Sequence, residues 1–98
     1  MTAYAIVRIE SDNPDLLKEY RAATPSILKK FGGEFIVRGG DVKTFEGPEE
    51  TRRMVLIEFP SMQHAEDFFH SAEYSAARKL REGIAEFEFI AVDGLNEE

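Results

Sequence analysis

The sequence predicts an α+β fold, a four-stranded antiparallel sheet with both helices on one of its faces. Three observations predict it. Short segments alternate apolar and polar side chains, two longer segments repeat apolar residues at helical spacing, and glycine or proline separates them. The order along the chain is strand, helix, strand, strand, helix, strand, which is the split βαβ arrangement. We expect one domain over residues 1–98, with a core of about 3–94 and a frayed acidic C-terminal end.

The first strand and the first helix occupy the N-terminal third of the chain. Residues 4–10 alternate in polarity, as a strand with one apolar face does. Asn13 and Pro14 then fit the cap and the first position of a helix. An apolar stripe at helical spacing follows, up to Gly32, which ends the helix. Pro25 predicts a kink or a break within it, because proline removes a backbone donor.

The second strand covers residues 34–38 and meets two glycines, Gly39 and Gly40. These glycines permit either a tight hairpin turn or a bulge in a longer strand. We favour the bulge, with the strand continuing over 42–46, because residues 47–51 make a better connection to the next strand.

The second half of the chain repeats this alternation of strand and helix. Residues 54–59 form the third strand, which Pro60 ends. Ser61 caps a short helix, and Ser71 is placed to cap a second helical piece. Residues 86–92 alternate in polarity again and form the closing strand.

Two helices on one side leave the other face of the sheet uncovered. That face would carry a row of apolar side chains, namely Tyr4, Ile6, Ile36, Leu56 and Ile90. A contiguous apolar patch of this kind rarely remains in water. We therefore expect a homodimer in which two sheets pack face to face about a two-fold axis.

Composition excludes several classes of function. The net charge of −7 argues against nucleic acid and anionic membranes as partners, since both select basic surfaces. The absence of cysteine removes disulfides, thiolate catalysis and cysteine-ligated metals. The N-terminus does not read as a signal peptide, and no apolar run approaches the roughly 20 residues of a membrane span, so we expect a cytoplasmic protein.

Arg38 and Glu58 are the best candidates for a polar site. Each is a charged residue within a strand, and each shares parity with an apolar residue, Ile36 or Leu56, on the uncovered face. Burying a lone charge is costly, so we expect the two to be substantially buried and within salt-bridge distance, or in contact with one common group. Three roles remain open: shaping a pocket, binding a ligand carboxylate through Arg38, or a structural ion pair at the dimer seam.

A second set of candidates lies on the last helical segment. Tyr74, Arg78 and Arg81 follow one another at helical spacing, beside the apolar face. Two guanidinium groups and a phenol suit a small anion, so Tyr74 and Arg81 join Arg38 and Glu58 as candidate ligand-binding residues. The alternative is an exposed basic face near a helix C-terminus, where positive charge is favourable.

The candidate catalytic residues are Glu58 and His64. Histidine is a common general base, so His64 is suited to that role, although a surface histidine is the simpler interpretation. His64 and Asp67 lie three residues apart on one helix, within reach of a common ion. His70 points to another side, which leaves too few ligands, so we expect no metal site.

Sequence motifs shared with a known family extend from Tyr4 to about Gly94. They are GGEFIVRGG at 32–40, EG at 46–47, VLIEFPS at 55–61, and SAEY at 71–74, followed by Arg81. In combination they resemble the family catalogued as domain of unknown function 1330. The resemblance implies a ferredoxin-like fold in the dimeric α/β barrel superfamily and no settled reaction. Relatives in that superfamily include cofactor-free monooxygenases, dehalogenase-like proteins and haem-degrading enzymes.

Three functional hypotheses follow. The first is a dimeric binding protein or enzyme with a polar pocket between sheet and helices, lined by Arg38, Glu58, Tyr74 and Arg81 and suited to a small organic acid. The second, by analogy with the superfamily, is a cofactor-independent monooxygenase-like enzyme. The third is a structural or interaction module with no ligand. The residues do not decide whether the protein is an enzyme, and they call for no cofactor.

Overall fold

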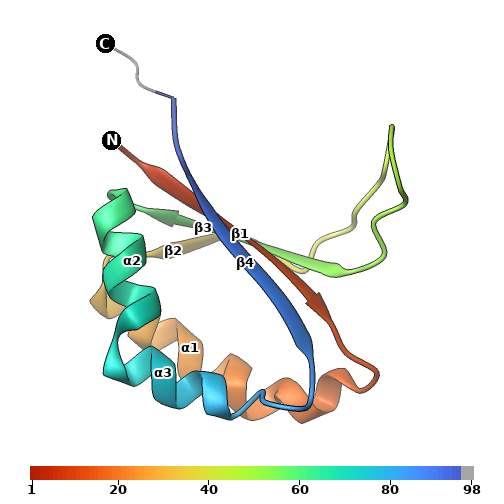
Figure 1. Cartoon of the computed structure of the whole chain (residues 1–98), viewed down its shortest axis with the longest axis horizontal. Helices are drawn as coiled ribbons and strands as arrows, with labels where there is room; N and C mark the ends of the chain where they lie inside the picture. The colour runs from red at the N-terminus through yellow and green to blue at the C-terminus, as the bar shows by residue number, and fades with distance from the viewer. Residues whose placement is uncertain (96–98) are drawn as a thin grey trace.

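The computed structural model describes residues 1–95 and confirms the α+β fold (Figure 1). A single antiparallel sheet has the strand order β2-β3-β1-β4. The elements, in chain order, are β1 (Ala3–Glu10), the 3₁₀ helix η1 (Pro14–Leu17), α1 (Lys18–Lys30), β2 (Glu34–Arg38), β3 (Arg53–Phe59), α2 (Met62–His70), α3 (Ala72–Lys79) and β4 (Glu86–Asp93).

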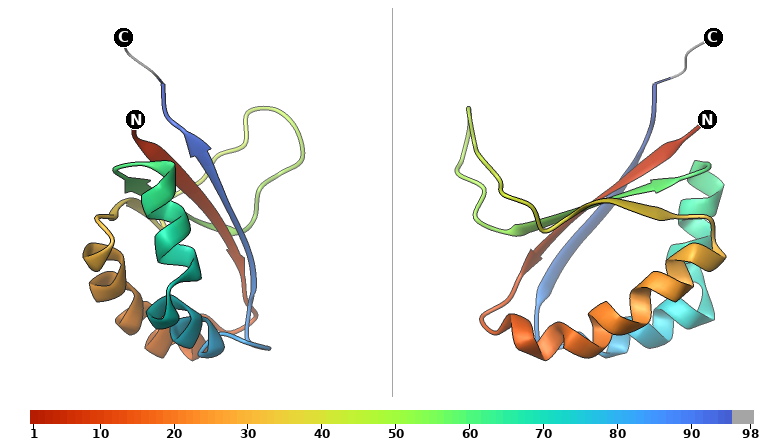
Figure 2. Two further views of the ribbon diagram at one scale, coloured as in Figure 1. Left: turned by 60° about the vertical axis from the view of Figure 1, so that its left-hand side comes forward. Right: turned by 180° about the vertical axis from the view of Figure 1, so that it is seen from behind.

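All helices lie on one side of the sheet (Figure 2). Alternation along each strand therefore produces one covered face and one open face. On the covered face Ala5, Val7 and Ile57 are buried. On the open face the apolar side chains stay partly in water, and Ile90 and Val92 remain 52% and 51% exposed. The structure thus has the uncovered apolar face that the sequence predicts.

The core between sheet and helices is built from aromatic side chains. Phe59, Phe68 and Tyr74 are fully buried, with Leu28 beside them. The rings of Phe68 and Tyr74 lie 4.4 Å apart between centroids, which joins α2 to α3. Large aromatic side chains supply most of the apolar area that a chain of this size buries.

The helical segments begin at the polar residues that the sequence predicts. Asn13 caps η1 through its side-chain oxygen, which accepts from the Asp15 backbone N–H. Ser61 and Ser71 cap α2 and α3 in the same way. The break expected at Pro25 does not occur, because α1 continues through it to Lys30. Within residues 1–95, no helix combines the length and apolar character that crossing a bilayer requires.

The end of β2 differs from the prediction. The bulge lies earlier than expected, between Phe35 and Val37, and β2 ends at Arg38. The predicted continuation over 42–46 is wrong, since residues 39–52 form a loop that reaches away on the side opposite the helices (Figure 2). Gly39 starts this loop at φ 78°, a conformation that suits glycine, and its N–H donates to the Met54 carbonyl.

Gly33 offers a test of how tightly the core is filled. A Cβ at Gly33 would lie 2.4 Å from Leu28 Cδ1 and 2.9 Å from Phe59 Cε1. We expect Gly33→Ala to lower the free energy of unfolding by about 1–3 kcal/mol, the usual cost of overpacking a core. Gly40→Ala is the control, because no heavy atom lies within 4 Å of its Cβ position. Denaturant titration of both variants measures the difference, and equal stability of the two would contradict this account of the core.

Candidate functional site

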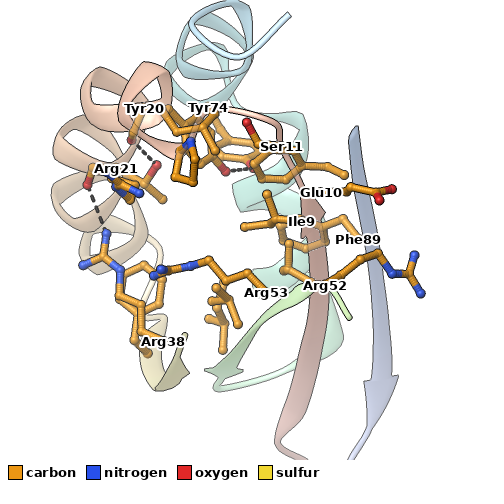
Figure 3. Close-up of a pocket in the computed structure, with 18 of the residues that line it drawn as sticks. Ile9, Glu10, Ser11, Tyr20, Arg21, Arg38, Arg52, Arg53, Tyr74 and Phe89 are labelled. Atoms are coloured by element: carbon orange, nitrogen blue, oxygen red, sulfur yellow. Dashed lines mark hydrogen bonds between the residues drawn. The ribbon is translucent and has the colours of Figure 1, made fainter. Parts of the chain in front are cut away.

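A cavity of about 310 Å³ lies between the covered face of the sheet and the helices (Figure 3). Its inner wall is apolar and comes from the strands and α2, with Val7, Val55, Ile57, Phe68 and Phe89 among its side chains. Its polar groups come from the helices and the strand ends, and include Tyr20, Thr24 and Tyr74 together with several arginines. A partly enclosed apolar cavity with a few convergent polar groups is the usual form of a small-molecule site.

The bulge in β2 decides where Arg38 points. Before the bulge Phe35 pairs with Ile57 on the covered face, and after it Val37 pairs with Leu56 on the open face. Arg38 then pairs with Val55, so it lies on the covered face and lines the cavity. Its guanidinium stands over the Phe35 ring at 4.3 Å.

This placement corrects the predicted pairing of Arg38 with Glu58. Glu58 lies on the open face, opposite Tyr4 of β1 and Glu34 of β2, and lines no part of the cavity. Arg38 is exposed rather than buried. The prediction assumed unbroken alternation along β2, and the extra residue at the bulge reverses the parity of Arg38.

Pro25 explains why Arg38 is held against α1. In a regular helix the N–H of residue 25 would donate to the carbonyl of Arg21, but proline has no N–H. Arg38 takes that place, with Nη2 donating to the Arg21 carbonyl oxygen at 3.1 Å. Pro25, where a kink or a break was expected, leaves a backbone acceptor that holds the Arg38 guanidinium at the rim of the cavity.

Two further arginines, Arg21 of α1 and Arg53 of β3, stand beside Arg38. Arg38 and Arg53 extend toward one another along one side of the cavity (Figure 3). Burial, and then the nearby charges of Arg21 and Arg38, lower the pKa of Arg53 from its usual value. Among residues 1–95, none of the three forms a salt bridge. We call Arg21, Arg38 and Arg53 the arginine cluster.

Gly39 packs directly against this cluster. A Cβ at Gly39 would lie 2.6 Å from Arg53 Cζ, so any larger residue would displace the guanidinium. Acidic residues also reach the rim, since Glu10 and Asp12 line the cavity. In Figure 3 the Glu10 carboxylate points outward on the side away from Arg38 and Arg53. Positive charge is therefore concentrated at one side of the opening.

Tyr74, one of the predicted ligand-binding residues, lines the cavity. It contacts Tyr20, which the sequence analysis did not name as a site residue. Its hydroxyl is 2.5 Å from the hydroxyl of Tyr20, in a buried contact between α3 and α1. The cap of α3 fixes Tyr74, because the Ser71 hydroxyl accepts from the Tyr74 N–H. Burial, together with the neighbouring Tyr74, raises the pKa of Tyr20, and Arg81 and Thr24 only partly offset this.

Arg81 lies behind the cavity wall rather than in the lining. Its guanidinium stacks over the Phe87 ring at 3.8 Å and stands 5.4 Å from the centre of the Tyr20 ring. Arg78 stacks in a similar way over Phe69 at 4.5 Å. The two arginines form the walls of a separate outer hollow between α3 and β4, so Arg81 does not share a cleft with Arg38.

His64 also lies away from the cavity. It is exposed near the start of α2, where its Nδ1 is 2.6 Å from the Ser61 hydroxyl. Over the described part of the chain, no group of three or more histidine, aspartate or glutamate side chains is arranged to hold a metal ion.

Two signals in the sequence point to residues that the prediction missed. Arg53 shares the parity of Val55 and Ile57, which places a charge at the end of a buried row. Tyr20 was counted in the apolar stripe of the first helix, although a buried tyrosine usually needs a partner for its hydroxyl. The proximity of Arg21 to these residues depends on how α1 lies on the sheet, which no local pattern reports.

A group of ion pairs holds the start of β3 on the open face. Glu50 lies 3.0 Å from Arg8 and 2.8 Å from Arg52, and Arg52 also contacts Glu88 at 2.6 Å. The hydrogen bonds from Arg52, with the charge of Arg8, lower the pKa of Glu50 from 4.5 to about 2. These contacts fix the end of the loop immediately before Arg53.

We expect this network to make stability depend on acid pH. Because the folded pKa of Glu50 is depressed, its contribution is fully present above pH 4.5 and is lost as the pH falls toward about 2. Glu50→Gln should therefore be less stable than the parent protein at neutral pH, and the gap should narrow across that window. Thermal melting at a series of pH values measures it. Glu49→Gln is the control, and a gap that stays constant with pH would contradict the assignment.

Comparison with known structures supports the fold. A protein of unknown function from Rhodopseudomonas palustris is 18% identical with a TM-score of 0.74, and the match covers 97% of this chain and 83% of that one. A dimeric protein of unknown function and ferredoxin-like fold from Bacteroides fragilis is 17% identical with a TM-score of 0.62, covering 95% and 96%. SnoaB, a cofactor-independent oxygenase from Streptomyces nogalater, is 9% identical with a TM-score of 0.68, covering 97% and 94%.

These likenesses establish a ferredoxin-like fold, and no curated protein matches the sequence. The family model described as a domain of unknown function (DUF1330) matches residues 2–95, which contain every helix and strand of the structure. The chain therefore belongs to the DUF1330 family.

Proposed function

We propose that the protein binds a small organic acid in the cavity between the sheet and the helices. The observation that carries this proposal is the arginine cluster, three guanidinium groups without a salt-bridge partner among residues 1–95, at the rim of an apolar cavity. Arginine stays protonated under ordinary conditions and matches a carboxylate with paired donors. A carboxylate at the rim would supply the negative charge that these groups otherwise take from solvent.

The interior of the cavity favours an apolar body on that acid. Phe35, Phe68 and Phe89 contribute aromatic surface, and Tyr74 lies beside them. The volume of about 310 Å³ is at the low end of the range for small-molecule pockets, so the ligand is small. Arg81 supports the cavity from outside through its stacking on Phe87 and Tyr20.

The net charge of the chain opposes the binding of an anion. The net charge of −7 repels an approaching anion at long range, although the arginine cluster attracts it locally. We therefore expect weak affinity, with a Kd of roughly micromolar or poorer.

A cofactor-independent oxygenase is the second candidate. The likeness in fold to SnoaB and the aromatic lining of the cavity support it. Glu58 and His64, the two candidate catalytic bases, both lie outside the cavity, which weighs against it. Oxygen uptake by the protein in the presence of a phenolic acid such as salicylate would favour this candidate over binding alone.

We also propose that the protein is a homodimer joined through the open face of the sheet. That face carries Ile6, Leu56, Ile90 and Val92, which no helix covers. The Bacteroides fragilis neighbour is described as dimeric. Burying an apolar sheet face against its own copy is the simplest way to remove it from water.

The organic-acid proposal predicts a difference between an acid and its amide. Benzoate should bind about tenfold or more tightly than benzamide, because a hydrogen bond to a charged group is worth about 1.5–3 kcal/mol. Arg38→Gln and Arg53→Gln should each weaken benzoate binding about tenfold and leave benzamide binding unchanged. Ligand-observed NMR titration suits such weak affinities.

Arg78→Gln is the matched control, since Arg78 lies in the outer hollow and lines no part of the cavity. Equal binding of benzoate and benzamide would contradict the proposal. Benzoate binding that is unchanged in both cluster variants would do the same. If neither acid nor amide binds, the result favours the hypothesis of a structural or interaction module with no ligand.

The homodimer proposal predicts a mass of about twice the 11.1 kDa chain by light scattering. Ile90→Asp places a charge on the open face, opposite Ile6 of β1, and should shift the protein toward the single-chain mass. Leu16→Asp is the control, because Leu16 is 56% exposed on η1, on the helix side of the sheet. A single-chain mass for the parent protein at micromolar concentration would overturn the proposal.

A further inference from the structure

The inner end of the cavity holds a pair of polar groups that is separate from the arginine cluster. Tyr20 and Tyr74 meet there, hydroxyl to hydroxyl, at 2.5 Å. Both residues line the cavity and both are buried. Figure 3 shows this pair on a different wall of the cavity from Arg38 and Arg53.

The pair of tyrosine hydroxyl groups has one O–H proton more than the bond between them uses. Two phenols carry two O–H protons, and the bond between them uses one. Within residues 1–95, no second hydrogen bond of either phenol oxygen meets normal distance and angle limits, although the Thr24 hydroxyl is near enough to lower the pKa of Tyr20. The neighbouring Thr24 hydroxyl donates its own proton to the Tyr20 carbonyl oxygen at 2.7 Å. One phenol proton therefore has no protein acceptor assigned to it, in a place where a buried donor is costly to leave unsatisfied.

The pair acts as a donor rather than as a base. A phenol buried in apolar surroundings and facing a second phenol is harder to ionise than one in water. The raised pKa of Tyr20 keeps its hydroxyl protonated at neutral pH. The donor of the Tyr–Tyr bond also polarises its acceptor, which makes the remaining O–H a better donor to a third group.

We propose that the cavity takes an oxo acid, a carboxylic acid that carries a carbonyl oxygen apart from its carboxylate. The proposal rests on the organic-acid function above. The carboxylate lies at the arginine cluster, and the carbonyl oxygen accepts the spare phenol proton at the inner end. The phenyl rings and aliphatic side chains between the two polar ends leave the connecting carbons in apolar surroundings.

Matched pairs of acids test this assignment. Levulinate differs from pentanoate, and 3-benzoylpropionate from 4-phenylbutanoate, by a carbonyl in place of a methylene. At least one oxo acid should bind about 3- to 10-fold more tightly than its partner, as one added hydrogen bond predicts. Ligand-observed NMR titration gives the ratio directly for each pair.

Phenylalanine variants test whether the tyrosine hydroxyl groups cause the preference for oxo acids. In the Tyr20→Phe, Tyr74→Phe double variant the ratio should fall to about one, while pentanoate and 4-phenylbutanoate still bind through the arginines. Tyr4→Phe is the matched control, because Tyr4 lies on the open face and lines no part of the cavity. If the double variant does not fold, the two single variants serve instead, and at least one of them must lose the preference.

The outcomes separate this proposal from the one on which it rests. Equal binding of oxo acids and their partners to the parent protein overturns the oxo-acid assignment and leaves the organic-acid function standing. A preference that persists in the double variant, or in both single variants, also overturns it. If no acid binds the parent protein, both proposals fail together.

Discussion

The arginine cluster depends on one extra residue in β2, which brings Arg38 to the cavity. Without the bulge between Phe35 and Val37, strict alternation would place Arg38 on the open face, the same face as Ile36. With it, Arg38 reaches the covered face, stacks on Phe35 and donates to the backbone of α1 where Pro25 leaves an acceptor free. A backbone irregularity in an edge strand and a proline in a helix are each mild defects alone. Together they hold a charged group at the entrance of an apolar cavity.

The sequence predicted most of the fold because its signals are local. The caps at Asn13, Ser61 and Ser71, and the alternation of the central strand, depend on neighbouring residues. The candidate site was predicted only in part, and its largest error has one cause. Parity along β2 was carried across a bulge that no residue type announces, which misplaced Arg38 relative to Glu58. The bond between Tyr20 and Tyr74 joins residues 54 positions apart, and such a contact depends on how the helices pack.

Keeping three guanidinium groups together without a protein carboxylate has a cost in folding free energy. Burial first, and then the positive charges of Arg21 and Arg38, lower the pKa of Arg53. On the other face of the same strands the chain does the opposite, since Glu50 and Glu88 neutralise Arg8 and Arg52. The chain thus supplies acidic partners to Arg8 and Arg52 and, among residues 1–95, leaves Arg21, Arg38 and Arg53 without a salt bridge. Charged side chains that lack a protein partner, and so reduce stability, are expected where a protein binds a ligand.

The tyrosine pair has a practical consequence of another sort. The chain contains no tryptophan and three tyrosines, so its near-ultraviolet absorbance and emission come mainly from phenol rings. Two of those three rings touch each other at the inner end of the cavity, with Arg81 beside one of them. The intrinsic spectrum of the unlabelled protein is therefore dominated by the environment of the cavity, and the molecule carries its own optical probe of whatever enters there.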